Sequence, residues 1–256
     1  PENLRFLEEK IDQTPGVESA FKSRLLLDKD PYLKDHYFNG SYLFPTVFGL
    51  EAMAQTVRHV LGTSLPQRLK IRDIKLKRPI TVDPKNGTDI LIRALKLEKD
   101  PEWSGTIIQA SITKAETQSG SDHFSASFIL EPQSKTTSKF SIPLSEHTLA
   151  LDPQLDLYKQ NLLFQGPLFQ RIQEVRSIEY SEENKLTTVF DSLLMNNNSA
   201  AKEAFPETKD QSLLLGDPFF RDSLLQSALL LVTEKTCLPV FIKEMDINIA
   251  PESAKT

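Results

Sequence analysis

Two apolar stretches at helical spacing stand out along the chain, one in each half. Val47–Val60 is apolar almost all round, interrupted mainly by Glu51, Gln55 and Arg58, and a helix with that pattern is typically buried. Phe219–Thr233 has the same character. Extended patterns follow the first stretch and predict strands at Leu69–Val82, Asp89–Glu98, Thr106–Lys114 and Phe124–Leu130. The first half therefore predicts one buried helix followed by an antiparallel sheet.

A polar stretch without periodicity separates this pattern from a second one. Residues 132–147 are rich in Ser, Thr and Lys, and with the turn at Ala150–Pro153 they are typical of a linker. We therefore expect a first unit over residues 1–133, a linker over 134–153 and a second unit over 154–256. The other predicted elements are a short helix at Asn3–Asp12 and strands at Ala20–Leu27, Phe169–Tyr180, Leu186–Leu194 and Leu238–Ile249.

The two units differ in how much chain follows the helix. Far fewer residues follow the second helix than the first, although several strands are needed to wrap a helix. The second unit is therefore expected to be truncated at its C-terminus and to cover its helix less completely.

Composition narrows the classes of partner. The net charge of −5 argues against a nucleic-acid partner, because phosphate binding favours a basic face. A small acidic carrier protein fits better if basic residues cluster, although a solvated strand face is the ordinary interpretation of such a cluster. The single cysteine, Cys237, excludes an internal disulfide and a cysteine-based metal site. The basic cluster consists of Arg68, Lys70, Arg72, Lys75, Lys77 and Arg78.

Candidate chemistry begins with a loop histidine, His36, just ahead of the first apolar helix. Gly40 frees the backbone to turn behind it, and Pro45 is placed to open the helix, where its fixed φ fits and its missing N–H costs nothing. Imidazole titrates near neutral pH, so this histidine suits acid/base chemistry on a ligand that lies along the helix. His59, further along the helix, is expected to pack or to lie on the surface, whereas His123 and His147 lie in polar turns and are expected to be solvated.

The spacing of this loop resembles a known motif. His36-x3-Gly40-x4-Pro45 is similar to the active-site loop in the dehydratase domains of polyketide and fatty-acid synthases. Leu50–Gln55 resembles the central helix of the hot-dog fold, in which a curved sheet wraps one long helix.

Two further matches lie in the second half, in the order that the family shows. Gly166–Phe169 resembles the Gly-Pro-x-Phe loop of these dehydratases, and Pro218–Gln226 resembles the Pro-x3-Asp-x3-Gln helix that carries their catalytic acid. The residues of both motifs are most similar to those of the enediyne and polyunsaturated-fatty-acid branches of these synthases. Just before the loop, many relatives have Tyr, or His in those branches, whereas this chain has Phe164-Gln165. The motif therefore does not establish a third polar contact to the substrate.

The resemblance implies an α+β fold, a double hot-dog of two tandem units. It also implies the loss of water from a β-hydroxyacyl thioester to give the α,β-enoyl thioester, with His36 as base and Asp222 as acid. Gln226 would orient the hydroxyl or Asp222, and backbone N–H groups around Thr46–Gly49 would polarise the thioester carbonyl. The residues expected to contact substrate are Gly40, Pro45, Gly49, Gly166, Pro167, Phe169 and Gln226.

The same resemblance implies the partners. The substrate would arrive on the phosphopantetheine arm of an acyl carrier protein, within a cytoplasmic polyketide or polyunsaturated-fatty-acid synthase. Neighbouring synthase domains are expected as further partners, and a homodimer is left open. No metal, redox or other cofactor bound by the domain is called for.

The two helices repeat one pattern, an acid and a glutamine one turn apart on the same face, in Glu51-x3-Gln55 and Asp222-x3-Gln226. In the single-unit bacterial dehydratases that this resembles, each site combines a histidine from one subunit with an acid from the other. Glu51 would need a histidine from the second half, and the chain has none after His147. We therefore expect one working site, with Glu51 as a structural relic.

Three other interpretations stay open. A double-bond isomerase acting on the same thioester needs the same base and acid. A product-template domain steers cyclisation with a similar His/Asp pair. A non-catalytic scaffold domain of the synthase is of a different class, and the intact His36 and Asp222 argue against it.

Overall fold

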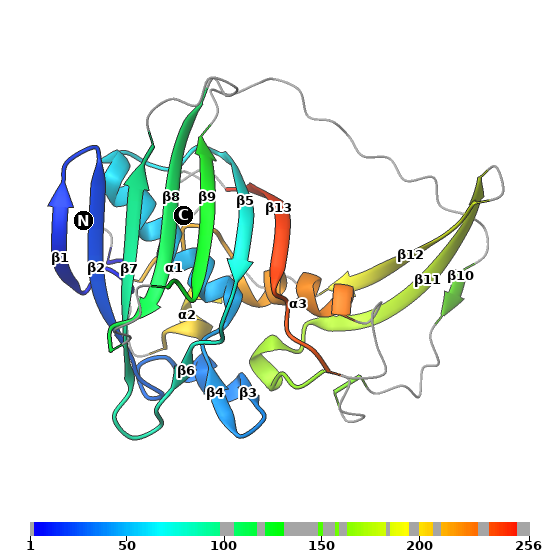
Figure 1. Ribbon diagram of the computed structural model, residues 1–256. Helices are drawn as coiled ribbons and strands as arrows, with labels where there is room; N and C mark the ends of the chain where they lie inside the picture. Colours follow the sequence, from blue (N-terminus) through cyan, green and yellow to red (C-terminus); the bar gives the residue numbers. More distant parts are fainter. Residues whose placement is uncertain are drawn as a thin grey trace.

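A curved antiparallel sheet of seven strands wraps one long helix, α1 (Thr46–Leu61), in the computed structural model (Figure 1). The structure describes residues 3–97, 105–116, 121–130, 148–150, 157–158, 163–182, 185–194, 200–206, 211–229 and 236–249. The strands lie in the order β1 (Glu9–Thr14), β2 (Glu18–Leu25), β7 (Thr88–Lys96), β8 (Thr106–Lys114), β9 (Phe124–Leu130), β5 (Arg68–Leu76) and β13 (Phe241–Asn248). The buried helix and its sheet confirm the pattern predicted for the first half.

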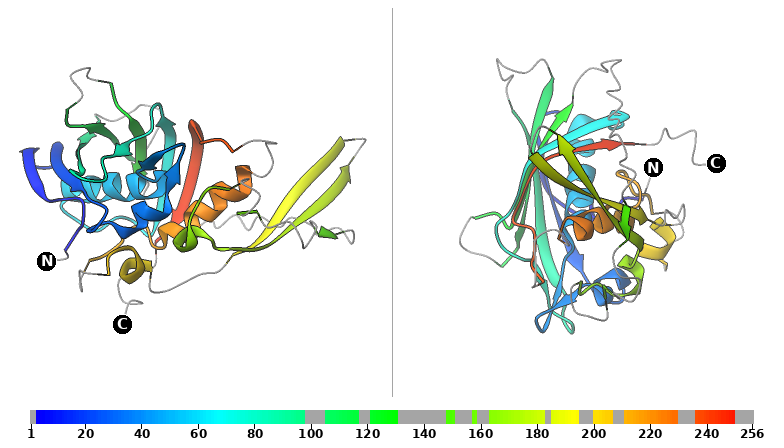
Figure 2. Two further views of the ribbon diagram at one scale, coloured as in Figure 1. Left: turned by 90° about the horizontal axis from the view of Figure 1, so that it is seen from below. Right: turned by 90° about the vertical axis from the view of Figure 1, so that its right-hand side faces the viewer.

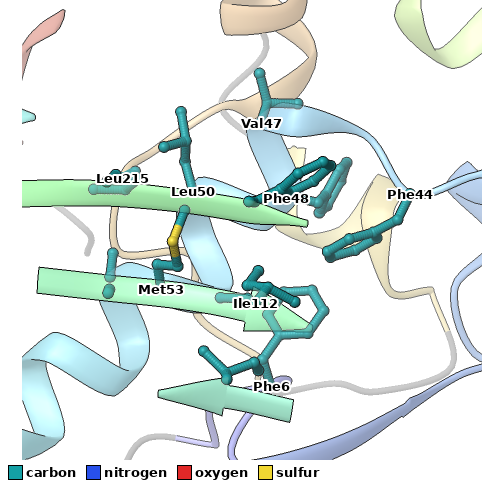
Figure 3. Close-up of a cluster of buried hydrophobic side chains, with 14 of the residues drawn as sticks. Phe6, Phe44, Val47, Phe48, Leu50, Met53, Ile112 and Leu215 are labelled. Atoms are coloured by element: carbon teal, nitrogen blue, oxygen red, sulfur yellow. The ribbon is translucent and has the colours of Figure 1, made fainter. Parts of the chain in front are cut away.

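Helix α1 is the centre of the core. Twelve of its sixteen residues are buried, and its apolar side chains contact those of the sheet (Figure 3). Phe48, Leu50 and Met53 are each at most 1% exposed, and burying one such side chain stabilises the fold by about 1.5–3 kcal/mol. Pro45 opens the helix, as predicted, and does so from the N-cap position, with φ −67° and ψ 142°. The helix ends at Leu61 and is followed by Gly62 as its C-cap, whose φ of 67° suits a residue without Cβ.

The second unit is built around α3 (Pro218–Leu229). Its last strand, β13, pairs antiparallel with β5, so the two units share one sheet. Strands β10 (Thr148–Ala150), β11 (Ile172–Glu182) and β12 (Lys185–Leu194) form a separate ribbon that extends away from the rest of the molecule (Figures 1 and 2). Helix α3 is covered less completely than α1, as expected, since Leu224 is 49% exposed. Of the expected linker, residues 134–147 and 151–153 lie outside the described residues, and 148–150 form β10.

Short elements complete the described part of the chain. A small sheet in the order β3 (Tyr37–Phe38), β4 (Ser41–Leu43) and β6 (Thr81–Val82) carries the loop that follows His36. The others are the 3₁₀ turns η1 (Pro31–Asp35) and η2 (Pro167–Phe169) and the helix α2 (Ala200–Ala204). No helix in the ranges that the structure describes has the length and apolarity needed to cross a membrane.

Two local predictions are wrong. The helix predicted at Asn3–Asp12 is replaced by β1, because Gly16 (φ 74°) reverses the chain and lets β1 pair with β2. Ahead of β1, Phe6 is buried and its backbone N–H donates to Oε1 of Gln55 at 2.9 Å. His123 is buried rather than solvated, since its backbone bonds to residues on either side in the sheet. His147 lies outside the described residues.

Candidate active site

His36 lies between η1 and β3 and is buried, with the residue 7% exposed. Its Nδ1 is 3.0 Å from the carbonyl oxygen of Leu43. Since a carbonyl oxygen only accepts, Nδ1 carries the proton and Nε2 keeps a free lone pair. Burial lowers the pKa of His36 to about 4, so the ring is neutral at physiological pH. A neutral imidazole with a bare Nε2 is equipped to act as a base.

The turn at Gly40 makes this arrangement. Asn39 and Gly40 both have positive φ, at 46° and 79°, and they reverse the chain between β3 and β4. The reversal brings Leu43 beside His36, whose carbonyl accepts the backbone N–H of Leu43 at 2.9 Å. Gly40 therefore fixes the tautomer of the histidine through the backbone.

Asp222 lies in the first turns of α3 and is 4% exposed. The helix starts where Oδ1 of Asp217 accepts the N–H groups of Phe219 and Phe220. Gln226 donates to Oδ2 of Asp222 at 2.8 Å, one turn further along. Burial raises the pKa of Asp222 to about 6, and the hydrogen bond from Gln226 opposes this rise. A carboxyl with that pKa holds its proton in mildly acidic solution.

One cavity joins the two groups. His36 and Asp222 both line a cavity of about 130 Å³, although they lie in different halves of the chain. Its remaining walls are mostly apolar, with Gln165 and Gln226 among the polar exceptions. A larger hollow of about 580 Å³ along the sheet contains neither residue. The geometry thus brings a base and an acid to one cavity.

Of the residues expected to contact substrate, Gln226 lines the cavity and the other six do not: Gly40, Pro45, Gly49, Gly166, Pro167 and Phe169. Gly49 lies where a Cβ would come within 2.7 Å of the Phe124 ring, so it permits close packing of α1 on β9. Its N–H donates to the Pro45 carbonyl at 3.0 Å. Thr46, at the start of α1, does line the cavity.

Asp35 supports the site in a way that the sequence did not predict. Its backbone carbonyl accepts the N–H of Gly166 at 2.7 Å, and its carboxylate accepts the N–H of Leu168 at 2.8 Å. A Cβ on Gly166 would lie 2.6 Å from the Asp35 carboxylate, which explains the glycine. The residue just before the histidine therefore docks the Gly-Pro loop of the second half. The only hint of this role in the sequence is that an acidic residue directly precedes the candidate base.

Phe169 connects the base to the acid. Its ring lies 5.4 Å from that of His36, centroid to centroid, and 5.0 Å from that of Phe219. Its carbonyl accepts from Nε2 of Gln226 at 3.1 Å, so the amide that bonds Asp222 is also held by this loop. The Gly-Pro-x-Phe motif thus supports both sides of the cavity through packing and backbone contacts.

The repeated acid–glutamine pattern has one geometry in both helices. Gln55 donates to Oε1 of Glu51 at 2.9 Å, as Gln226 does to Asp222. Glu51 also accepts the N–H groups of Leu214 and Leu215 at 2.8 and 2.9 Å. The Glu51 carboxylate therefore ties α1 to the segment that leads into α3. Among the described residues no hydrogen bond reaches Oδ1 of Asp222.

The basic cluster is partly neutralised by β13. Arg68 pairs with Asp246 at 3.1 Å, and Lys70 and Arg72 pair with Glu244 at 3.4 and 3.3 Å. Lys77 and Arg78 instead contribute to the wall of the cavity. In the ranges that the structure describes, no three His, Cys, Asp or Glu side chains are grouped so that they could hold a metal ion.

Two family models match the chain. The model of the polyketide synthase dehydratase domain matches residues 5–110, and that of the polyketide synthase dehydratase N-terminal domain matches residues 136–255. Together they span most of both units, and the chain belongs to the polyketide synthase dehydratase domain family. A search of curated proteins found no match.

Solved structures of such domains share the fold. The dehydratase domain from the CurF module of the curacin polyketide synthase has a TM-score of 0.63 at 15% identity, over 94% of this chain and 82% of its own. That of a mycocerosic acid synthase-like polyketide synthase has a TM-score of 0.62 at 14% identity, over 94% and 80%. The dehydratase domain of the polyketide synthase PpsC from Mycobacterium tuberculosis has a TM-score of 0.57 at 20% identity, over 89% of this chain and 74% of its own. These likenesses confirm the α+β double hot-dog fold.

Proposed function

We propose that this domain removes water from a β-hydroxyacyl thioester to give the α,β-enoyl thioester. The observation that supports this most is the shared cavity of His36 and Asp222, whose pKa values are displaced to about 4 and about 6. Between these values the histidine is neutral and the carboxyl is protonated. Those are the protonation states that a base and an acid need at the start of the reaction.

In the proposed reaction, Nε2 of His36 takes the proton from the α-carbon of the thioester. The electron pair left behind forms the double bond between the α- and β-carbons, and the bond from the β-carbon to its oxygen breaks. Asp222 gives its proton to that oxygen, which departs as water. The proton on His36 then returns to Asp222 through solvent. Each transfer contributes roughly 10²–10⁴-fold when the group is well placed.

The thioester carbonyl gains negative charge as the α-proton leaves. The N–H groups of Thr46 and Val47 open α1 and have no acceptor within the helix, so they are free to stabilise that charge. Phe48 and Gly49 are poorer donors, since both donate to the Pro45 carbonyl. Thr46 lines the cavity, which places this helix end beside the proposed substrate.

The proposal extends to the partners. The substrate would be presented on the phosphopantetheine arm of an acyl carrier protein, beside other domains of a cytoplasmic synthase. The residues of the two motifs in the second half favour the enediyne and polyunsaturated-fatty-acid branches of these synthases. Because the reaction moves only protons and water, it requires no metal or redox cofactor.

The test is incubation of the protein with a series of 3-hydroxyacyl pantetheine thioesters, followed by mass spectrometry for the loss of one water. Wild-type protein is expected to form the enoyl product, and His36→Ala is expected to form it at least about 100-fold more slowly. Folded wild-type protein that converts none of the series would refute the proposal. Supplying the enoyl product and finding the shifted double bond instead would favour an isomerase, which needs the same two groups.

A further inference from the structure

Gln165 is a buried polar residue that the proposed chemistry has not used. It is 5% exposed and lines the same cavity as His36 and Asp222. Within the described part of the chain, its Oε1 has no hydrogen-bond partner. A buried amide oxygen without a partner lowers stability, so such an atom in a cavity calls for a ligand that donates to it.

The backbone holds this side chain in place. The carbonyl of Gln165 accepts from Nε2 of Gln170 at 2.9 Å, and the next residue, Gly166, donates to the carbonyl of Asp35 at 2.7 Å. On the other side, the ring of Phe164 lies 4.9 Å from that of His36. Both neighbours of Gln165 are therefore anchored to the loop that carries the proposed base. The backbone that carries the Gln165 amide is thereby held beside the loop of the proposed base.

Building on the proposed function, we propose that Gln165 recognises the β-hydroxyl of the substrate. A hydroxyl has one hydrogen to donate and two lone pairs to accept with. Protonated Asp222 donates to the oxygen, which leaves the hydroxyl hydrogen in need of an acceptor. Oε1 of Gln165 is an unpaired acceptor in the same cavity, and in the proposed reaction Nε2 of His36 is engaged by the α-proton.

This contact makes Gln165 a specificity-determining residue. A 3-hydroxyacyl chain satisfies Oε1, whereas an acyl chain without the hydroxyl leaves it buried and unpaired. The enoyl product also lacks the hydroxyl, so the contact is lost when water departs. Gln165 therefore favours binding of the substrate over retention of the product.

The test compares two ligands on three proteins by calorimetry. The ligands are a short-chain 3-hydroxyacyl pantetheine amide and its 3-deoxy counterpart, both without the labile thioester. The proteins are the wild type, Gln165→Leu, and a matched control, Phe164→Leu, which changes an apolar neighbour in the same wall. Wild type is expected to bind the hydroxyl ligand at least about tenfold more tightly than the deoxy ligand.

Gln165→Leu is expected to remove most of this preference, since only the contact from Asp222 remains, while leaving the Kd of the deoxy ligand within about twofold. Phe164→Leu is expected to weaken both ligands equally and to keep the preference. If Gln165→Leu keeps the preference, or weakens both ligands alike, the inference is overturned, whether or not the wild type dehydrates thioesters. If the preference disappears in Gln165→Leu but wild type dehydrates no thioester, the hydroxyl contact stands and the proposed reaction falls.

Discussion

The carboxylate of Asp35 and the backbone N–H of Leu168 are joined by a 2.8 Å hydrogen bond across 133 positions of sequence. Asp35 directly precedes His36, and Leu168 directly precedes Phe169, whose carbonyl holds Gln226. The bond therefore connects the loop of the proposed base to the network around the proposed acid.

Removing this bond is expected to loosen the site without unfolding the protein. Asp35→Ala should lower the rate of dehydration by roughly tenfold to 100-fold, because a displacement of about 1 Å between reacting groups has an effect of that size. Asp35→Asn keeps an acceptor oxygen and should stay within a few-fold of wild type. Rates on a 3-hydroxyacyl thioester, with circular dichroism as the folding control, check both. Equal rates for Asp35→Ala and wild type would show that the contact does not position the site.

The rate should depend on pH in a bell shape. His36 must be neutral, which holds above its pKa of about 4, and Asp222 must be protonated, which holds below its pKa of about 6. Values of kcat/KM should therefore peak between these values and fall about tenfold per pH unit beyond either, reporting the free protein. Measurement from pH 3.5 to 8 checks this. A rate that rises through pH 7 would contradict the assigned roles.

His36 and Asp222 should behave as a unit. Asp222→Asn and His36→Ala should each reduce turnover at least about 100-fold, and the double variant should lose little more. The reason is that a base without its acid, or the reverse, completes no reaction cycle. Turnover of the three variants on a carrier-linked 3-hydroxyacyl substrate tests this. Losses that multiply in the double variant would indicate independent roles.

Asp222→Asn should also stabilise the fold, but only at higher pH. Burial raises the pKa of Asp222 from its ordinary 3.8 to about 6, so the stability that the protonated carboxyl provides is present below 3.8 and is lost as pH rises through 6. The asparagine variant escapes this loss, which amounts to about 3 kcal/mol. Urea unfolding should show the variant more stable at pH 8 and similar to wild type near pH 4. An equal difference at both pH values would contradict the shifted pKa.

Glu51→Gln should lower the stability of the fold and leave turnover nearly unchanged, the opposite of Asp222→Asn on both counts. Glutamine has one acceptor oxygen, so its NH₂ group would face the N–H of Leu215, which Oε2 of Glu51 now accepts. We expect a loss of about 1–3 kcal/mol in the free energy of unfolding, with turnover within a few-fold of wild type. Urea midpoints and kcat, measured beside those of Asp222→Asn, check this pair. If Glu51→Gln abolished turnover in folded protein, the assignment of the acid would be wrong.

Periodicity predicted the first unit well. Thr106–Lys114 and Phe124–Leu130 were expected as strands and are β8 and β9 with the same bounds. The local pattern gave a wrong prediction where pairing with a distant strand decides the structure, as at β1, which lies partly in the segment Asn3–Asp12 that was expected to be a helix. It also gave the strand β13 without its partner, since nothing local specifies β5.

For the site, the resemblance pointed to His36 and Asp222, and the structure brings them to one cavity. It did not separate residues that shape the backbone from residues that line the cavity. Gly40 and Gly166 owe their identity to a turn and to a close approach, and both look like binding residues in a motif. Asp35 and Gln165 were missed because their contacts depend on loops that meet only in the folded chain.

The pairing of β13 with β5 has a consequence for synthesis on the ribosome. Arg68 and its partner Asp246 are 178 positions apart, so β5 emerges long before β13. Until β13 is made, the unpaired edge of β5 can pair with the same strand of another nascent chain. Arg68, Lys70 and Arg72 line that edge, and two copies of it repel each other. The late strand brings Glu244 and Asp246, which turn this repulsion into attraction and select the correct partner.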